Sequence, residues 1–197
     1  MTPEEARRIV AQAARATLDQ GGVVAYATES SYALGVDPRS RTGVEAVLRI
    51  KGREEGKPLP VVAADTDQLR MLPLAPGSAA LAWGASYWPA ALSVLLPLQS
   101  PLPASRGADT VAVRIPDRPS LRDLLSAIGL PLTATSANSS GTPPLVDPRA
   151  VGAWLEQSGA LYCLVDEGIL PGGAPSTLVE LVDGRPRVLR QGPVRVD

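Results

Sequence analysis

Short apolar runs of the kind that form buried strands recur along this chain. The run Val23-Val-Ala-Tyr-Ala27 is almost wholly apolar, which is typical of a strand that is buried on both faces. The later stretches 176–182 and 187–190 flank Asp183-Gly184, and this arrangement predicts a β-hairpin. Further apolar runs predict strands at about 59–64, 92–96, 110–115, 130–134 and 161–165.

Segments with helical periodicity lie between these strands. Thr2-Pro3-Glu4-Glu5 is a capping box with proline at the first helical position, and apolar positions from Ile9 to Leu18 share one face, so we predict a helix over 3–20. Further helices are predicted at about 42–51, 76–85, 119–128 and 147–154, with a short one after Asp65. This order predicts an α/β fold in a single domain over 1–197, with one mixed, twisted open sheet and flanking helices.

Composition excludes several kinds of chemistry. The 197 residues include no histidine, so Ser-His-Asp and Cys-His catalysis and histidine-ligated metals are excluded. A formal net charge of −1 argues against nucleic-acid binding driven by the charge of the whole protein. A local basic groove is still compatible with this net charge. The chemistry that remains uses carboxylates, lysine, hydroxyl groups or electrostatic stabilisation alone.

The same features indicate a cytoplasmic protein. The single cysteine, Cys163, lies in an apolar run and cannot form an internal disulfide, which suits a reducing compartment. The acidic start of the chain does not resemble a signal peptide. Because no run approaches the ~20 apolar residues of a membrane span, we expect a soluble protein without membrane association.

Both lysines of the protein lie in one short segment. Lys51 and Lys57 flank Arg53, whereas the other sixteen arginines are spread along the chain. A cluster of cations predicts an anion site, but Lys51 also falls at the end of a predicted helix, where a cation contributes roughly 0.3–1 kcal/mol by itself. On this segment alone the two interpretations are equally good.

Polar clusters follow two of the apolar runs and supply further candidates. Thr28-Glu-Ser-Ser-Tyr32 and Thr135-Ser-Ala-Asn-Ser-Ser-Gly141 come directly after predicted strands, where α/β folds place ligands. Arg114 lies among apolar neighbours and must either pair with an internal carboxylate or receive an anionic ligand. Hydroxyl groups and cations without histidine indicate a polyanion site suited to phosphoryl or nucleotidyl transfer. A Walker A motif is missing, because Gly52-Arg-Glu-Glu-Gly-Lys-Pro58 is one residue too short.

Several of these segments together resemble the YrdC-like family, and in particular its short, single-domain L-threonylcarbamoyladenylate synthases. The resemblance covers a core of about residues 20–193. Each motif alone is weak, but the set in this order is specific. The motifs are Ala27-Thr-Glu-Ser-Ser-Tyr-Ala-Leu-Gly35, Lys51-Gly-Arg53 with Lys57-Pro-Leu59, Trp88-Pro89, Thr110-Val-Ala-Val-Arg-Ile-Pro116, Ser136-Ala-Asn138, Pro175-Ser-Thr177 and Leu189-Arg190.

The resemblance implies a nucleotidyltransferase with a basic concave groove. Such an enzyme joins L-threonine, bicarbonate or CO2, and ATP into threonylcarbamoyl-AMP and releases pyrophosphate, for the N6-threonylcarbamoyl modification of tRNA adenosine 37. ATP is then a substrate that brings Mg2+ with it, and no tightly bound, protein-ligated metal is expected. The implied partners are the small-molecule substrates and downstream threonylcarbamoyl-transfer proteins, and the family's older label as a double-stranded RNA binder adds tRNA or double-stranded RNA.

The resemblance also implies roles for individual residues. Lys51 and Arg53 correspond to the catalytic cations. The L-threonine site would comprise Thr28, Pro60, Arg114, Ala134 and Ser176. The ATP site would comprise Lys51, Thr110, Ser136, Asn138, Pro144 and Arg190.

The chain departs from the family pattern at three alanines, and other functions remain open. Ala27, Ala33 and Ala90 stand where the family usually has proline or glycine, which leaves a paralogue acting on another carbamoyl or acyl adenylate as one alternative. An RNA-binding module without turnover is a second. A hydrolase using Ser136 with Lys51 or Lys57 as its base is a third.

Overall fold

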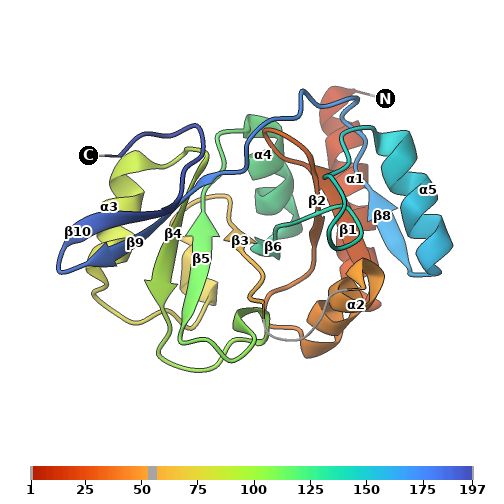
Figure 1. Ribbon diagram of the computed structural model, residues 1–197. Helices are drawn as coiled ribbons and strands as arrows, with labels where there is room; N and C mark the ends of the chain where they lie inside the picture. The colour runs from red at the N-terminus through yellow and green to blue at the C-terminus, as the bar shows by residue number, and fades with distance from the viewer. Residues whose placement is uncertain (1, 53–56, 197) are drawn as a thin grey trace.

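Two mixed sheets lie beside each other in the computed structural model, with helices packed around them (Figure 1). The structure describes residues 2–52 and 57–196. The four-stranded sheet has the order β7 (Thr135–Ser136), β2 (Tyr32–Gly35), β1 (Val23–Ala27), β8 (Tyr162–Leu164). The six-stranded sheet has the order β10 (Arg185–Arg190), β9 (Thr177–Val182), β4 (Leu92–Pro97), β5 (Thr110–Arg114), β3 (Val61–Val62), β6 (Leu132–Thr133).

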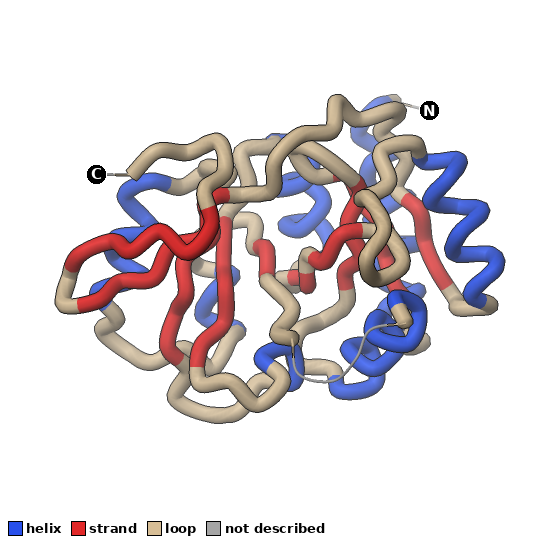
Figure 2. Tube along the Cα trace, in the orientation of Figure 1, coloured by secondary structure: helices blue, strands red, loops and turns tan. Residues whose placement is uncertain are grey.

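Helices contact both sheets. In the four-stranded sheet, α1 contacts β1 and β8, α2 contacts β1 and α5 contacts β8, whereas α3 contacts β4 and β9 of the larger sheet. Figure 2 shows α5 at the outer edge of the smaller sheet. No helix in the described ranges combines the length and hydropathy that a bilayer span requires. The helices are α1 (Pro3–Asp19), α2 (Arg41–Lys51), α3 (Ala79–Tyr87), α4 (Pro119–Ile128) and α5 (Pro148–Ser158), with 3-10 turns η1 (Gln68–Met71) and η2 (Pro103–Ser105).

The predicted mixed α/β fold is confirmed, and its strands divide between two sheets rather than one. The capping box at Thr2 and Glu5 is present at the start of α1. The hairpin is also present, and both turn residues, Asp183 and Gly184, have positive φ angles, as a two-residue type I′ turn requires. The strands β2 and β7 were not predicted, because β2 is short and follows a polar cluster and β7 is only two residues long.

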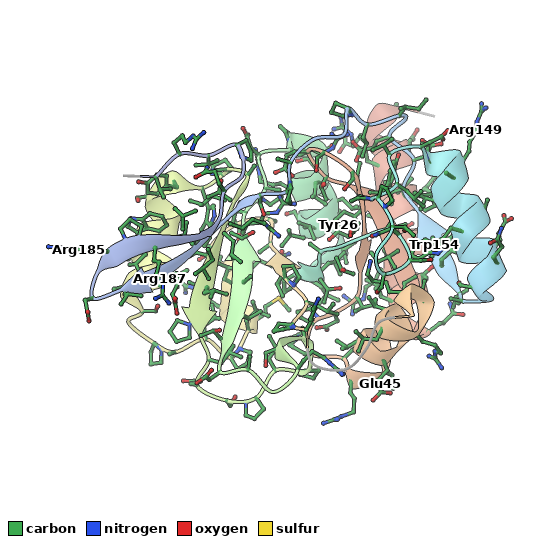
Figure 3. All side chains as sticks on the ribbon, viewed as in Figure 1. Tyr26, Glu45, Arg149, Trp154, Arg185 and Arg187 are labelled. Atoms are coloured by element: carbon green, nitrogen blue, oxygen red, sulfur yellow. The ribbon has the colours of Figure 1, made fainter. Side chains whose placement is uncertain are left out.

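One extended segment joins the two sheets. Residues 132–133 pair with β3 in the larger sheet, and 135–136 pair with β2 in the smaller sheet. Between these pairs, the Ala134 N–H donates to the Pro60 carbonyl (2.8 Å). The fully buried Tyr26, labelled in Figure 3, donates its hydroxyl to the Thr133 carbonyl (2.6 Å). The chain therefore passes from one sheet to the other without leaving the core.

Gly35 is needed where β1 and β2 pack closely. A Cβ at this position would lie 2.5 Å from Tyr26 Cε1 and 3.1 Å from Leu132 Cβ. Overpacking of this kind typically costs about 1–3 kcal/mol, and at this chain length each kcal/mol lowers Tm by about 2–4 °C. We expect Gly35→Ala to lower Tm by several degrees in a thermal melt.

Gly152 provides the matched control for this substitution. It lies within α5, and a Cβ there would meet only Leu164 Cδ2, at 3.7 Å, an ordinary contact. Alanine is better than glycine in a helix by about 1 kcal/mol, so Gly152→Ala should raise Tm. Equal Tm values for the two variants would contradict the packing described around Tyr26.

Candidate active site

A pocket of about 420 Å3, with both polar and apolar side chains in its lining, opens on one face of the six-stranded sheet. Alternate residues of β4 and β5 form its floor, because Leu92, Val94 and Leu96 are buried in the core while the intervening side chains line the pocket. The start of β2 and the short strand β7, both from the smaller sheet, supply part of the wall. The pocket therefore lies where the two sheets meet.

Eight of the twelve site residues implied by the family resemblance line this pocket. They come from segments far apart in the sequence, and most lie at strand ends or next to them. These residues are Thr28, Pro60, Thr110, Arg114, Ala134, Ser136, Ser176 and Arg190.

Arg114 is held by a carboxylate from the turn between β1 and β2. Its Nη1 lies 2.7 Å from Glu29 Oε2, and its side chain is only 11% exposed. The second oxygen of Glu29 accepts a hydrogen bond from the Asp117 backbone N–H (3.1 Å). This pairing fixes the guanidinium at the pocket wall. It also resolves the two sequence-based alternatives, because Arg114 both has an internal partner and lines a pocket.

Arg190 brings a second guanidinium to the same pocket. Its Nε and Nη2 donate to the Ser176 carbonyl at 3.1 and 2.9 Å. Burial and, to a lesser extent, the nearby positive charge of Arg114 lower the pKa of Arg190. The smaller contribution, from Arg114, reflects repulsion between the two cations, and an anion bound near both would relieve it.

Lys51 lies behind the pocket wall rather than in it. The residue is 4% exposed, and its ammonium donates to the carbonyls of Ser136 (2.5 Å) and Asn138 (2.9 Å) and to Asn138 Oδ1 (3.1 Å). The described residues that line the pocket include Ser136 but not Lys51. The end of α2 packs beneath the 136–140 segment, so Lys51 supports from behind the segment that presents Ser136.

Asn138 belongs to the same buried network. Its Oδ1 accepts from the Ser136 hydroxyl (2.6 Å), and its amide donates to the Ser139 carbonyl (3.0 Å). Trp154 donates its indole N–H to Ser139 Oγ (3.1 Å) while its ring packs against the core. Asn138 thus shapes the loop that presents Ser136 and does not itself line the pocket.

The two remaining predicted site residues are Arg53 and Pro144. Arg53 lies outside the described residues. Pro144 is exposed and is not among the described lining residues. It follows the loop stabilised by Asn138.

Several polar residues near the site were missed in the sequence. Arg118 pairs with Glu167 (2.6 Å) and donates to the Thr28 carbonyl (3.3 Å), which ties the start of α4 to the end of β1. The hydroxyl of Tyr32 donates to the Gly168 carbonyl (2.9 Å), and burial raises the pKa of this phenol. In the sequence, the only indication of these contacts is that Tyr32 belongs to the polar cluster after the first predicted strand.

Comparison with known proteins identifies the family of this chain. Residues 16–192 match the Sua5/YciO/YrdC family model, whose description is telomere recombination. The chain belongs to the Sua5/YciO/YrdC family. The match covers most of the chain and confirms the resemblance that the motifs indicated.

Named members of the Sua5/YciO/YrdC family are similar over most of the chain. Threonylcarbamoyl-AMP synthase of Marinobacter nauticus is 36% identical over 87% of this chain and 91% of that protein. The Bacillus subtilis protein of the same name is also 36% identical, over 93% of this chain but only 53% of its own length. The chain thus spans about half of the Bacillus relative and nearly all of the Marinobacter one.

A solved structure of the Sua5/YciO/YrdC family agrees with the fold. P. abyssi Sua5, crystallised in complex with L-threonine, superposes with a TM-score of 0.82 at 30% identity, covering 98% of this chain and 55% of that one. The agreement extends over nearly all of the chain, so both sheets belong to the shared architecture.

Proposed function

We propose that this protein is a threonylcarbamoyl-AMP synthase. The observation that carries the proposal is the pocket itself, which gathers Arg114, Arg190 and the hydroxyl groups of Thr28, Ser136 and Ser176 from both sheets. The two guanidinium groups suit negatively charged reactants, and the hydroxyl groups make the lining around them polar. The L-threonine complex of P. abyssi Sua5 and the names of the similar synthases support the same activity.

The reaction joins three substrates in two steps. The amine of L-threonine takes up CO2, supplied by bicarbonate, and loses a proton to become a carbamate. A carbamate oxygen then attacks the α-phosphorus of ATP, a new P–O bond forms, and the bond to the β-phosphate oxygen breaks with release of pyrophosphate. Charge accumulates on phosphate and carbamate oxygens, so fixed cations and hydrogen-bond donors stabilise the transition state without a histidine.

We assign the threonine subsite to the Arg114 side of the pocket. The planar guanidinium suits a bidentate contact with the α-carboxylate. Thr28 and Ser176 add hydroxyl groups, and Pro60 and Ala134 form the adjoining wall, joined by their backbone hydrogen bond.

We assign the ATP subsite to other residues of the pocket lining and to the loop behind Ser136. Thr110, Ser136 and Arg190 line the pocket, and Asn138 stabilises the Ser136 loop from behind. Lys51 supports the same loop through its ammonium. In this proposal Lys51 and Arg53 are the catalytic cations, and Pro144 lies at the outer edge of the ATP subsite.

The lining residues among the described part of the chain include no carboxylate. A cavity of this character favours a Mg2+ ion that arrives with the triphosphate over one held by a protein cage.

The proposed product defines the partners. Threonylcarbamoyl-AMP is a mixed anhydride that hydrolyses readily, so a transfer protein that modifies adenosine in tRNA must receive it. We place the protein in the cytoplasm with that machinery, and we include tRNA among its candidate ligands.

An assay of pyrophosphate release tests the activity. The protein is incubated with ATP, Mg2+ and bicarbonate, and with L-threonine, L-serine or no amino acid. We expect release that depends on both L-threonine and bicarbonate. Release without an amino acid, or its absence with threonine, would overturn the proposed function, and salt-sensitive RNA binding in place of turnover would favour a binding module.

A further inference from the structure

Ser93 is a buried hydroxyl in an otherwise apolar strand. The strand β4 reads Leu-Ser-Val-Leu-Leu-Pro, and Ser93 is only 2% exposed. Because Leu92 and Val94 on either side are buried in the core, the Ser93 side chain lies on the opposite face, where it lines the pocket. A buried polar group needs a partner, and its partner identifies what the residue does.

That partner is a residue already assigned to the threonine subsite. The Oγ atoms of Ser93 and Ser176 are 2.9 Å apart. On the other side of Ser93, the strands β4 and β5 pair Val94 with Val113, and continuing this antiparallel register by one residue sets Ser93 opposite Arg114. Cross-strand neighbours on one face have Cβ atoms about 4.5–5.5 Å apart. Ser93 therefore lies between Arg114 and Ser176 on the pocket floor.

The two hydroxyl groups together leave one donor for a ligand. One proton lies between the Oγ atoms, whichever serine supplies it. Ser176 Oγ also accepts from Arg190 Nη2 at 3.4 Å, and the described residues show no further hydrogen bond of the Ser93 hydroxyl. The second hydroxyl proton, together with an unused lone pair, is thus available to a group bound in the pocket.

We propose that Ser93 determines specificity for a β-hydroxy amino acid: with Ser176 it forms a hydroxyl pair that binds the substrate's β-hydroxyl, beside the Arg114 that binds the α-carboxylate. The inference rests on the proposed function and assigns a further residue to its amino-acid subsite. The carboxylate and the hydroxyl of threonine are on adjacent carbons, so the groups that recognise them must be neighbours, as Arg114 and Ser93 are. Valine has the same shape but a methyl in place of the hydroxyl, and it would leave the pair unsatisfied.

Equilibrium binding of L-threonine and L-valine to wild type and Ser93→Ala tests the proposal. Wild type should bind threonine at least about 100-fold more tightly than valine, since a site built around a hydroxyl rejects the analogue that lacks it. In Ser93→Ala we expect threonine binding to weaken about tenfold, while valine binding changes less than about twofold. The ratio of the two affinities is the decisive quantity, because a general loss of structure would weaken both ligands together.

Two further variants keep the test decisive. Ser93→Thr retains the hydroxyl and should keep most of the discrimination. Ser105→Ala removes another buried serine hydroxyl, one that donates to the Ala108 carbonyl (2.7 Å) and does not line the pocket, and should leave the ratio unchanged. An unchanged threonine-to-valine ratio in a folded Ser93→Ala would overturn the role of Ser93 even if wild type turns over threonine. Absence of turnover in wild type would instead count against the proposed function, while the binding ratio still tests Ser93.

Discussion

Replacing Lys51 with methionine is expected to reduce threonine-dependent pyrophosphate release by about 100-fold or more. The ammonium is the charged centre that holds the carbonyls of Ser136 and Asn138 and the Asn138 side chain in place. Methionine fills a similar volume but cannot donate, so the loop that presents Ser136 to the pocket loses its support. Steady-state kinetics with ATP as the varied substrate should show the reduced rate of pyrophosphate release.

The same substitution should also lower stability. It leaves buried oxygen atoms without their donor, at a cost of about 1–3 kcal/mol for each unsatisfied group, which a thermal melt would register as a fall in Tm. Arg49→Ala is the matched control, because Arg49 is an exposed cation in the last turn of the same helix. We expect its activity to stay within about twofold of wild type. Full activity of Lys51→Met would refute a role for this lysine in the site.

Replacing Arg114 with lysine is expected to raise KM for L-threonine by about 10- to 100-fold with a smaller effect on kcat. Lysine keeps the positive charge but not the planar fork that can bind Glu29 and a carboxylate together. The effect should therefore fall on amino-acid binding and not on KM for ATP. Kinetics with each substrate varied in turn would separate the two.

An exposed ion pair supplies the control for Arg114. Arg70 pairs with Asp67 at 3.2 Å, and both side chains are more than 80% exposed. Pairs of this kind contribute at most about 1 kcal/mol, so Arg70→Lys should leave both KM values unchanged. An Arg114→Lys variant with wild-type KM for threonine would remove Arg114 from the amino-acid subsite.

The sequence predicted the elements better than their arrangement. Capping at Thr2, the glycine after Ile128 and the turn at Asp183-Gly184 are local signals, and each correctly marked the end of an element. The division into two sheets arises because residues 132–133 pair with β3 while residues 135–136 pair with β2, and no local sequence pattern encodes that switch. The strand β2 was missed for the related reason that four residues carry too little periodicity.

The candidate site shows the same limit. Arg114 was predicted because an arginine in an apolar strand requires an explanation, and the pocket at its position provides one. Its partner Glu29 could not be identified, because the contact joins residues 85 positions apart. Lys51 contacts Ser136 and Asn138, the residues with which the resemblance grouped it, but only packing at the end of α2 decides that it supports their loop from behind. Ser93 was overlooked because its significance comes from its register with Arg114 and not from its sequence context.

The pocket between the two sheets is expected to bind L-threonine and ATP together. A crystal structure of the protein with L-threonine and a non-hydrolysable ATP analogue tests it directly. We predict the amino-acid carboxylate within hydrogen-bond distance of the Arg114 guanidinium and the phosphates beside Ser136 and Arg190. Threonine or nucleotide bound elsewhere, with only solvent in the pocket between the sheets, would contradict the assignment of both substrates to this pocket.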